Sequence, residues 1–227
     1  MSSLAEQVSS AGLADRILSE RRLGDLLGGG DARRYGLVNR ALKDGSLVRV
    51  KRGIYLLGSH FRSEQVHPFA IAQGLVPGSY VSFESALVHH GWIPEAVFVT
   101  ASVSPGRKTL SVDSPDFGPF SFHPIAVQDY RFLTSIDPIR MGKLTAFIAQ
   151  PLRALMDLVA LRKVRWVGIE WLTVGLRIDQ DHLFSLRRKD FAALKLVYKH
   201  KAVIAFLEAL EQAVMTKKGS ARWSGHD

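Results

Sequence analysis

The sequence of 227 residues contains no cysteine. Disulfides, thiolate metal sites and thiol redox chemistry are therefore excluded, and nothing in the chain requires an oxidising compartment. Long apolar runs are also missing, since no stretch reaches the roughly 18 to 20 residues that cross a membrane. The first turns carry charge, so the apolar core of a signal peptide is missing too. We expect a cytoplasmic protein without a membrane partner.

Acidic residues are fewer than basic ones. The sequence has 30 Lys and Arg against 21 Asp and Glu, a net charge of +9. Residues 1–58 contain ten basic and six acidic residues, residues 59–149 six and seven, and residues 150–227 fourteen and eight. Both ends of the chain are basic and the middle is not. Such ends favour polyanionic partners through long-range attraction and counterion release.

The beginning of the chain has the pattern of three helices. A first helix is predicted over Leu4–Ile17 from its apolar spacing. Ser19 is placed to cap a second helix over Glu20–Leu27, because a serine hydroxyl can accept from free backbone amides. Asp31 is placed to cap a third helix that ends at Asp44, since a glycine triplet precedes it and a glycine follows it.

A basic hairpin follows these helices. Leu47–Val50 and Gly53–Leu57 are rich in β-branched and aromatic residues, and a tight turn of sequence Lys-Arg-Gly joins them. Three helices and a basic hairpin predict a winged helix-turn-helix in residues 1–59. The alternative is a small helical subdomain with a solvated run of charges.

The third helix has the chemistry of a DNA-reading helix. Its apolar residues share one face at helical spacing, which leaves the polar face free, and Gly36 allows close approach to a partner. In the major groove of double-stranded DNA, arginine pairs with guanine and asparagine with adenine. Lys43 and the hairpin bases suit phosphate or the minor groove. The predicted DNA-binding residues are Arg33, Arg34, Asn39, Arg40, Lys43, Arg49, Lys51 and Arg52.

Residues 60–215 predict a second, mixed α/β domain that ends in helices, and residues 216–227 a flexible basic tail. The whole chain is therefore expected to be an α+β protein. Helices are predicted over residues 64–75, 83–89, 151–160, 166–176 and 191–215, the last broken near 198–200. Strands are predicted over residues 80–82, 97–103, 109–113 and 120–123.

No catalytic set is evident. His89 and His90 are adjacent, so they do not share a helix face, and neither has an acidic or histidine partner four residues on. Ser82, Ser85 and His89 offer only a weak nucleophile and base, which caps and core contacts explain as well. We expect no enzyme, metal or cofactor. A hydrolase or nucleotidyltransferase that uses Ser82, Glu84 or His89 is the minor alternative.

A second basic patch follows residue 186. It contains Arg187, Arg188 and Lys189, with Lys195, Lys199 and Lys201 further along. It suits DNA that flanks the site or an acidic protein, and a solvated helix face explains it equally well. The aromatic residues nearby are expected to lie in the core. These are Trp166, Trp171, Phe191 and Phe206.

Three stretches resemble the AbiEi-type antitoxins and transcriptional regulators of bacterial type IV toxin-antitoxin systems. They are the hairpin Asp44–Tyr55, the segment Tyr80–Pro94 with sequence YVSFESALVHHGWIP, and Ile148–Leu158 with sequence IAQPLRALMDL. The resemblance extends over most of the chain, from Leu13 to Met215. It implies an N-terminal winged helix that represses its own operon by binding inverted repeats in the promoter.

The resemblance also implies a C-terminal antitoxin domain. This domain would counteract a nucleotidyltransferase-like toxin, without a stable contact between the two having to form. Two alternatives stay open. The middle and C-terminal part can be a protein-interaction module that the DNA-binding part places, or the chain can be a stand-alone regulator without antitoxin activity.

Overall fold

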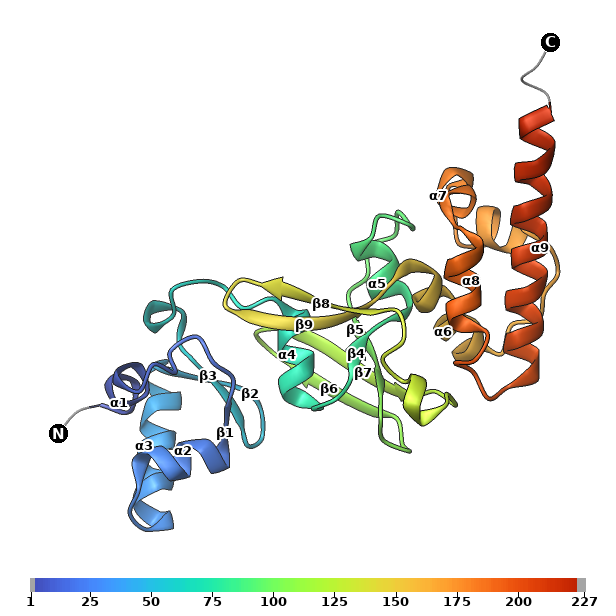
Figure 1. Ribbon diagram of the computed structural model, residues 1–227. Helices are drawn as coiled ribbons and strands as arrows, with labels where there is room; N and C mark the ends of the chain where they lie inside the picture. Colours follow the sequence, from blue (N-terminus) through green and yellow to red (C-terminus); the bar gives the residue numbers. More distant parts are fainter. Residues whose placement is uncertain (1–2, 224–227) are drawn as a thin grey trace.

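The computed structural model describes residues 3–223, with side chains up to residue 218. It has a mixed α+β fold with three parts in chain order: an N-terminal unit, a central sheet and a group of C-terminal helices. Figure 1 shows these parts in a row, with the two ends of the chain far apart. The two basic ends of the sequence therefore lie at opposite ends of the molecule.

The N-terminal unit combines three helices with a small antiparallel sheet. The strand order is β1-β3-β2, so the two-residue β1 extends the hairpin. The elements are α1 (Leu4–Ser10), β1 (Leu18–Ser19), α2 (Glu20–Leu27), α3 (Asp31–Lys43), β2 (Leu47–Lys51) and β3 (Ile54–Leu57). The predicted second helix and hairpin are confirmed.

Local sequence explains where these helices begin and end. The Ser19 hydroxyl accepts from the amide of Arg22 and caps α2, as predicted. The first helix is shorter than predicted, because it ends at Ser10 and Gly12 has a left-handed φ of 70°. The predicted cap at Asp31 is wrong: Gly30 is the cap residue, and Asp31 pairs with Arg34 inside the first turn of α3.

The central sheet has six strands in the order β6-β7-β5-β4-β9-β8. Its pairs β4–β9 and β5–β7 are parallel and the others antiparallel. Helix α4 packs against β4, β5 and β9, and α5 packs against β5. The elements are η1 (Ser59–Phe61), α4 (Pro68–Leu75), β4 (Tyr80–Val81), α5 (Phe83–His89), β5 (Thr100–Ser104), β6 (Leu110–Ser114), β7 (Gly118–Pro124), η2 (Asp129–Arg131), β8 (Ile136–Met141) and β9 (Leu144–Ala149).

The central part departs from the sequence prediction in three places. The helix predicted from residue 64 begins at Pro68, because the fixed φ of proline suits the first turn and His67 caps it. The strand predicted over residues 97–103 begins only at Thr100. The β8–β9 hairpin was not predicted, and it forms the edge of the sheet beyond β4.

The C-terminal part is helical. Its elements are α6 (Pro151–Arg162), η3 (Trp171–Gly175), α7 (Gln180–Ser185), α8 (Arg188–Leu194) and α9 (Lys201–Trp223). The predicted break near residues 198–200 is confirmed. The helix predicted over residues 166–176 is wrong, since only the π-helical turn η3 forms. Helix α9 continues to Trp223, beyond residue 215 where the last helix was predicted to end; residues 224–227 of the predicted tail lie outside the described part.

Two hydrophobic clusters form the core. The smaller one lies within the N-terminal unit, and the larger one extends from the sheet into the C-terminal helices. Val50 and Leu56 of the hairpin belong to the larger cluster, so the N-terminal unit packs directly on the central part. The predicted core aromatics are confirmed, with Phe191 and Phe206 buried and Trp166 against Phe206. Across residues 3–223, the helices are too short or too polar to span a bilayer.

Candidate nucleic-acid interface

A cleft of about 700 Å³ opens between α2, α3 and the β2–β3 hairpin. We call it the N-terminal cleft. Four arginines and three carboxylates line it, so it carries charges of both signs. Its lining residues are Glu20, Arg21, Leu23, Gly24, Asp25, Leu27, Asp31, Arg34, Tyr35, Val38, Asn39, Arg49, Arg52 and Tyr55.

Four of the eight predicted DNA-binding residues line this cleft. Asn39 reaches it from α3, and Arg49 and Arg52 reach it from the hairpin. Both hairpin arginines are exposed. Arg34 also lines the cleft, but its guanidinium is ion-paired with Asp31. The structure therefore brings one amide and two available guanidinium groups together from elements that are separate in sequence.

Three other predicted residues lie on α3 outside the cleft. One guanidinium nitrogen of Arg33 donates to the carbonyl of Leu27 at 3.2 Å, which folds the side chain back over the preceding glycines. Arg40 donates through Nε to the carbonyl of Gly36 at 3.3 Å, along its own helix. Lys43 is exposed in the last turn. These cations do not converge with the hairpin arginines.

Lys51, also predicted to bind DNA, does not belong to the exposed hairpin face. Its Nζ donates to the carbonyl of Leu75 at 3.0 Å, and burial lowers the pKa of the ammonium group. A β-bulge between Arg49 and Lys51 explains this direction. In a regular strand, side chains two residues apart point to the same side of the sheet. The extra residue of the bulge interrupts this alternation, so the side chain of Lys51 does not follow that of Arg49.

Sequence reasoning missed two residues of the cleft. Tyr35 projects from α3 with 72% of its surface exposed. Arg21 is exposed in the first turn of α2. The spacing of Tyr35 and Asn39, four residues apart on one helix, was the one clue in the sequence, because such residues are neighbours on the helix surface.

The second basic patch is partly neutralised. Lys195 pairs with Glu211 at 2.8 Å, and Lys199 pairs with Asp129 at 3.2 Å. The backbone amide of Arg187 donates to Asp190 at the start of α8. The side chains of Arg187, Arg188 and Lys189 are exposed. This patch is thus a mixed-charge surface.

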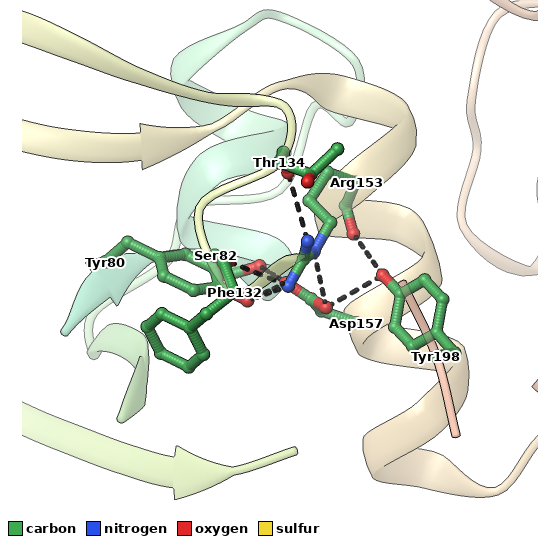
Figure 2. Close-up of polar contacts among 7 residues, drawn as sticks. All are labelled: Tyr80, Ser82, Phe132, Thr134, Arg153, Asp157 and Tyr198. Atoms are coloured by element: carbon green, nitrogen blue, oxygen red, sulfur yellow. Dashed lines mark hydrogen bonds and ion pairs between the residues drawn. The ribbon is translucent and has the colours of Figure 1, made fainter. Parts of the chain in front are cut away.

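A buried polar network lies in the central part (Figure 2). Arg153 and Asp157, one turn apart on α6, are both fully buried and form an ion pair at 3.0 Å. Asp157 accepts hydrogen bonds from Tyr80 at 3.0 Å, Ser82 at 2.8 Å and Tyr198 at 2.8 Å. The second arm of the Arg153 guanidinium donates to the carbonyl of Thr134 at 3.0 Å. The network joins β4, α6, the loop before β8 and the segment between α8 and α9.

Electrostatics favour the protonated tyrosines and the charged arginine in this network. Burial raises the pKa of the Tyr80 and Tyr198 hydroxyls well above the ordinary value, and the Asp157 charge adds to that effect. Burial opposes the charge on Arg153, but the neighbouring Asp157 and tyrosines outweigh it and raise the pKa of the guanidinium. The hydroxyls therefore remain donors, and the network serves to hold the fold.

The weak nucleophile and base weighed from the sequence are not brought together. Ser82 is the N-cap residue of α5, but its hydroxyl donates to Asp157 and makes no capping hydrogen bond. The Ser85 hydroxyl donates to the carbonyl of Val99 at 2.8 Å and accepts from Ala101. The His89 ring packs edge-on against Phe69 and His90. Within residues 3–223, no three His, Asp or Glu side chains cluster as metal ligands would.

No protein-family model and no curated protein matches this sequence. A function for the chain is therefore inferred chiefly from the geometry of the N-terminal cleft and from the charges around it.

Proposed function

We propose that the N-terminal unit is a winged helix-turn-helix that binds double-stranded DNA. Its element order is helix, strand, helix, helix and hairpin, and its strand order places β3 between β1 and β2. In such a unit the second helix of the helix-turn-helix pair enters the major groove, and the hairpin lies against the adjacent backbone. Here those elements are α3 and the β2–β3 hairpin, which we call the wing.

The observation that carries this proposal is the shared cleft. Asn39 of α3 and Arg49 and Arg52 of the wing open to one concave surface, so a single duplex can contact both elements. Arginines on a wing neutralise phosphates and release counterions, which supplies affinity with little sequence choice. An amide on the helix in the groove supplies choice, because it matches the edge of adenine.

We further propose that this DNA-binding protein is a transcriptional repressor and a type IV antitoxin, and that it is not an enzyme. The support is the resemblance of three stretches to the AbiEi-type proteins. Two of them, Tyr80–Pro94 and Ile148–Leu158, supply residues of the buried network. These two segments therefore belong to one folded unit, as expected of a domain with a function separate from DNA binding.

A gel-shift experiment with the DNA upstream of its own gene tests the DNA-binding proposal. Arg49→Ala and Arg52→Ala are each expected to weaken binding to all duplexes and to reduce the salt slope by about 0.9 per lost phosphate contact. Arg165→Ala is the matched control, since it removes an exposed arginine of the C-terminal part that lies outside both basic patches. Equal affinity for upstream and random duplexes would contradict the repressor proposal.

The antitoxin proposal has a separate test. The chain is co-expressed with a neighbouring nucleotidyltransferase-like gene product, and growth is measured. We expect the intact chain to rescue growth. The doubly substituted Arg49→Ala, Arg52→Ala chain is expected to rescue growth as well at matched levels, because relief of toxicity would then not depend on DNA binding. Toxicity that persists beside the folded intact chain would count against the antitoxin role.

A further inference from the structure

The exposed ring of Tyr35 is the largest unexplained feature of the N-terminal cleft. It lies on α3 one turn before Asn39, and both residues line the cleft together with the wing arginines. Residues four apart on a helix have side chains about 5–6 Å apart, a spacing that covers one to two base-pair steps. An aromatic ring that is 72% exposed contributes nothing to the core of the unit.

The arginines of α3 are directed elsewhere. Arg33 is bonded to the carbonyl of Leu27, and Arg34 is paired with Asp31. Arg40 is bonded along the helix to Gly36 and does not line the cleft. The face that α3 presents beside the wing therefore offers an aromatic ring and an amide, with no unpaired guanidinium.

We propose that Tyr35 and Asn39, and not Arg33 and Arg40, determine which sequence the protein binds, and that they read adjacent A·T base pairs. This inference rests on the proposed DNA-binding function. The Asn39 amide can donate to N7 and accept from N6 of one adenine. The Tyr35 ring supplies an apolar surface for a thymine methyl group, the feature that marks thymine in the major groove. Guanine recognition would need a bidentate arginine at this face.

Selection from a pool of randomised duplexes, followed by competition binding, tests this inference with the full chain. The wild-type protein is expected to select neighbouring A·T pairs in each half-site. Asn39→Ala is expected to lose about 5- to 150-fold of its preference for adenine at one position, the value of one bidentate contact. Tyr35→Ala is expected to lose preference for thymine at the neighbouring position, and Tyr35→Phe to retain it.

The matched controls are Arg33→Ala and Arg40→Ala, which keep the selected sequence even where they weaken binding to all duplexes. Thermal melting of each variant verifies the fold; Asn39→Ser, which keeps a small polar side chain, replaces Asn39→Ala should that variant not fold. A wild-type protein that binds no duplex in the pool would contradict the DNA-binding function itself, whereas one that binds duplexes without selecting a sequence would overturn this inference alone. A wild-type protein that selects guanine, or selectivity lost in the arginine variants and kept in the Tyr35 and Asn39 variants, would overturn this inference alone.

Discussion

Arginine has opposite tasks in two regions of this molecule. Arg49 and Arg52 extend into water from the wing, whereas Arg153 is fully buried beside Asp157. An exposed guanidinium is already hydrated and keeps its donors free for a ligand. A buried one has lost its water, so its donors must be paired within the fold. An exposed arginine on the wing therefore indicates ligand binding, whereas the buried Arg153 indicates a role in structural specificity.

The largest effect is expected from breaking the buried pair. Arg153→Met leaves the Asp157 carboxylate buried without its counter-ion, and should lower the free energy of unfolding by about 3–5 kcal/mol. Denaturant unfolding measures this loss. Adding Asp157→Leu should recover only part of it, because the hydroxyls of Tyr80 and Ser82 then lack their acceptor.

Arg52→Ala is the matched control for that experiment. Its side chain is exposed, so the free energy of unfolding should change by no more than about 0.5 kcal/mol. A loss as large as that of Arg153→Met would break the distinction between the two regions.

A substitution at Gly36 should change the stability of the N-terminal unit and its DNA binding in opposite directions. A methyl group at this helical position meets no neighbouring atom within 4 Å, and alanine is the better helix former. Gly36→Ala should therefore raise the free energy of unfolding by about 0.5–1 kcal/mol. It should at the same time weaken DNA binding, because in the proposed placement of α3 the bare backbone of Gly36 allows close approach to a groove. Unfolding curves and gel shifts on the same preparation measure both; stronger DNA binding would argue against this placement of α3.

Local sequence sufficed to predict elements whose ends are fixed by their own residues. The range of α2 follows from the Ser19 cap and the glycines after Leu27, and the hairpin follows from its glycine turn. The strand β1 could not be predicted from local sequence, since its two residues form a strand only by pairing with β3. The bulge that turns Lys51 away from the wing is likewise a property of the paired hairpin.

The buried network illustrates the same limit at the level of side chains. Arg153 and Asp157 are spaced as any exposed helical ion pair would be, so their spacing does not indicate their burial. The tyrosines that bond Asp157, Tyr80 and Tyr198, lie more than 40 positions away from it in the sequence. On α3 and the wing, likewise, the free arginines could be distinguished only by the internal acceptors that hold Arg33 and Arg34.

A smaller effect is expected from the acidic turn beside the wing. Asp113 and Asp116 share a hollow of about 400 Å³ with Arg49, close enough to repel a phosphate that Arg49 would bind. Replacing both by asparagine should raise affinity for random duplex by about twofold to fivefold, the scale of one surface charge pair. Asp181→Asn, an exposed substitution on α7, is the control. Unchanged or weaker binding at low salt would show that this turn does not face the DNA.

The smallest effect concerns an ion pair near the surface that joins the N-terminal unit to the β8–β9 turn. Asp15 accepts from Lys143 at 2.9 Å and from the amide of Ser63 at 2.8 Å, and the hydrogen bond from Lys143 is the main cause of its lowered pKa. Because the folded pKa lies below the unfolded one, the stabilisation is complete above the ordinary aspartate pKa of about 4 and is lost as pH falls through the lowered value. Lys143→Met should cost only about 0.2–1 kcal/mol at neutral pH, since Lys143 is half exposed, and should flatten the acid limb of the stability curve. A cost near that of Arg153→Met would mean that burial is not what separates the two pairs.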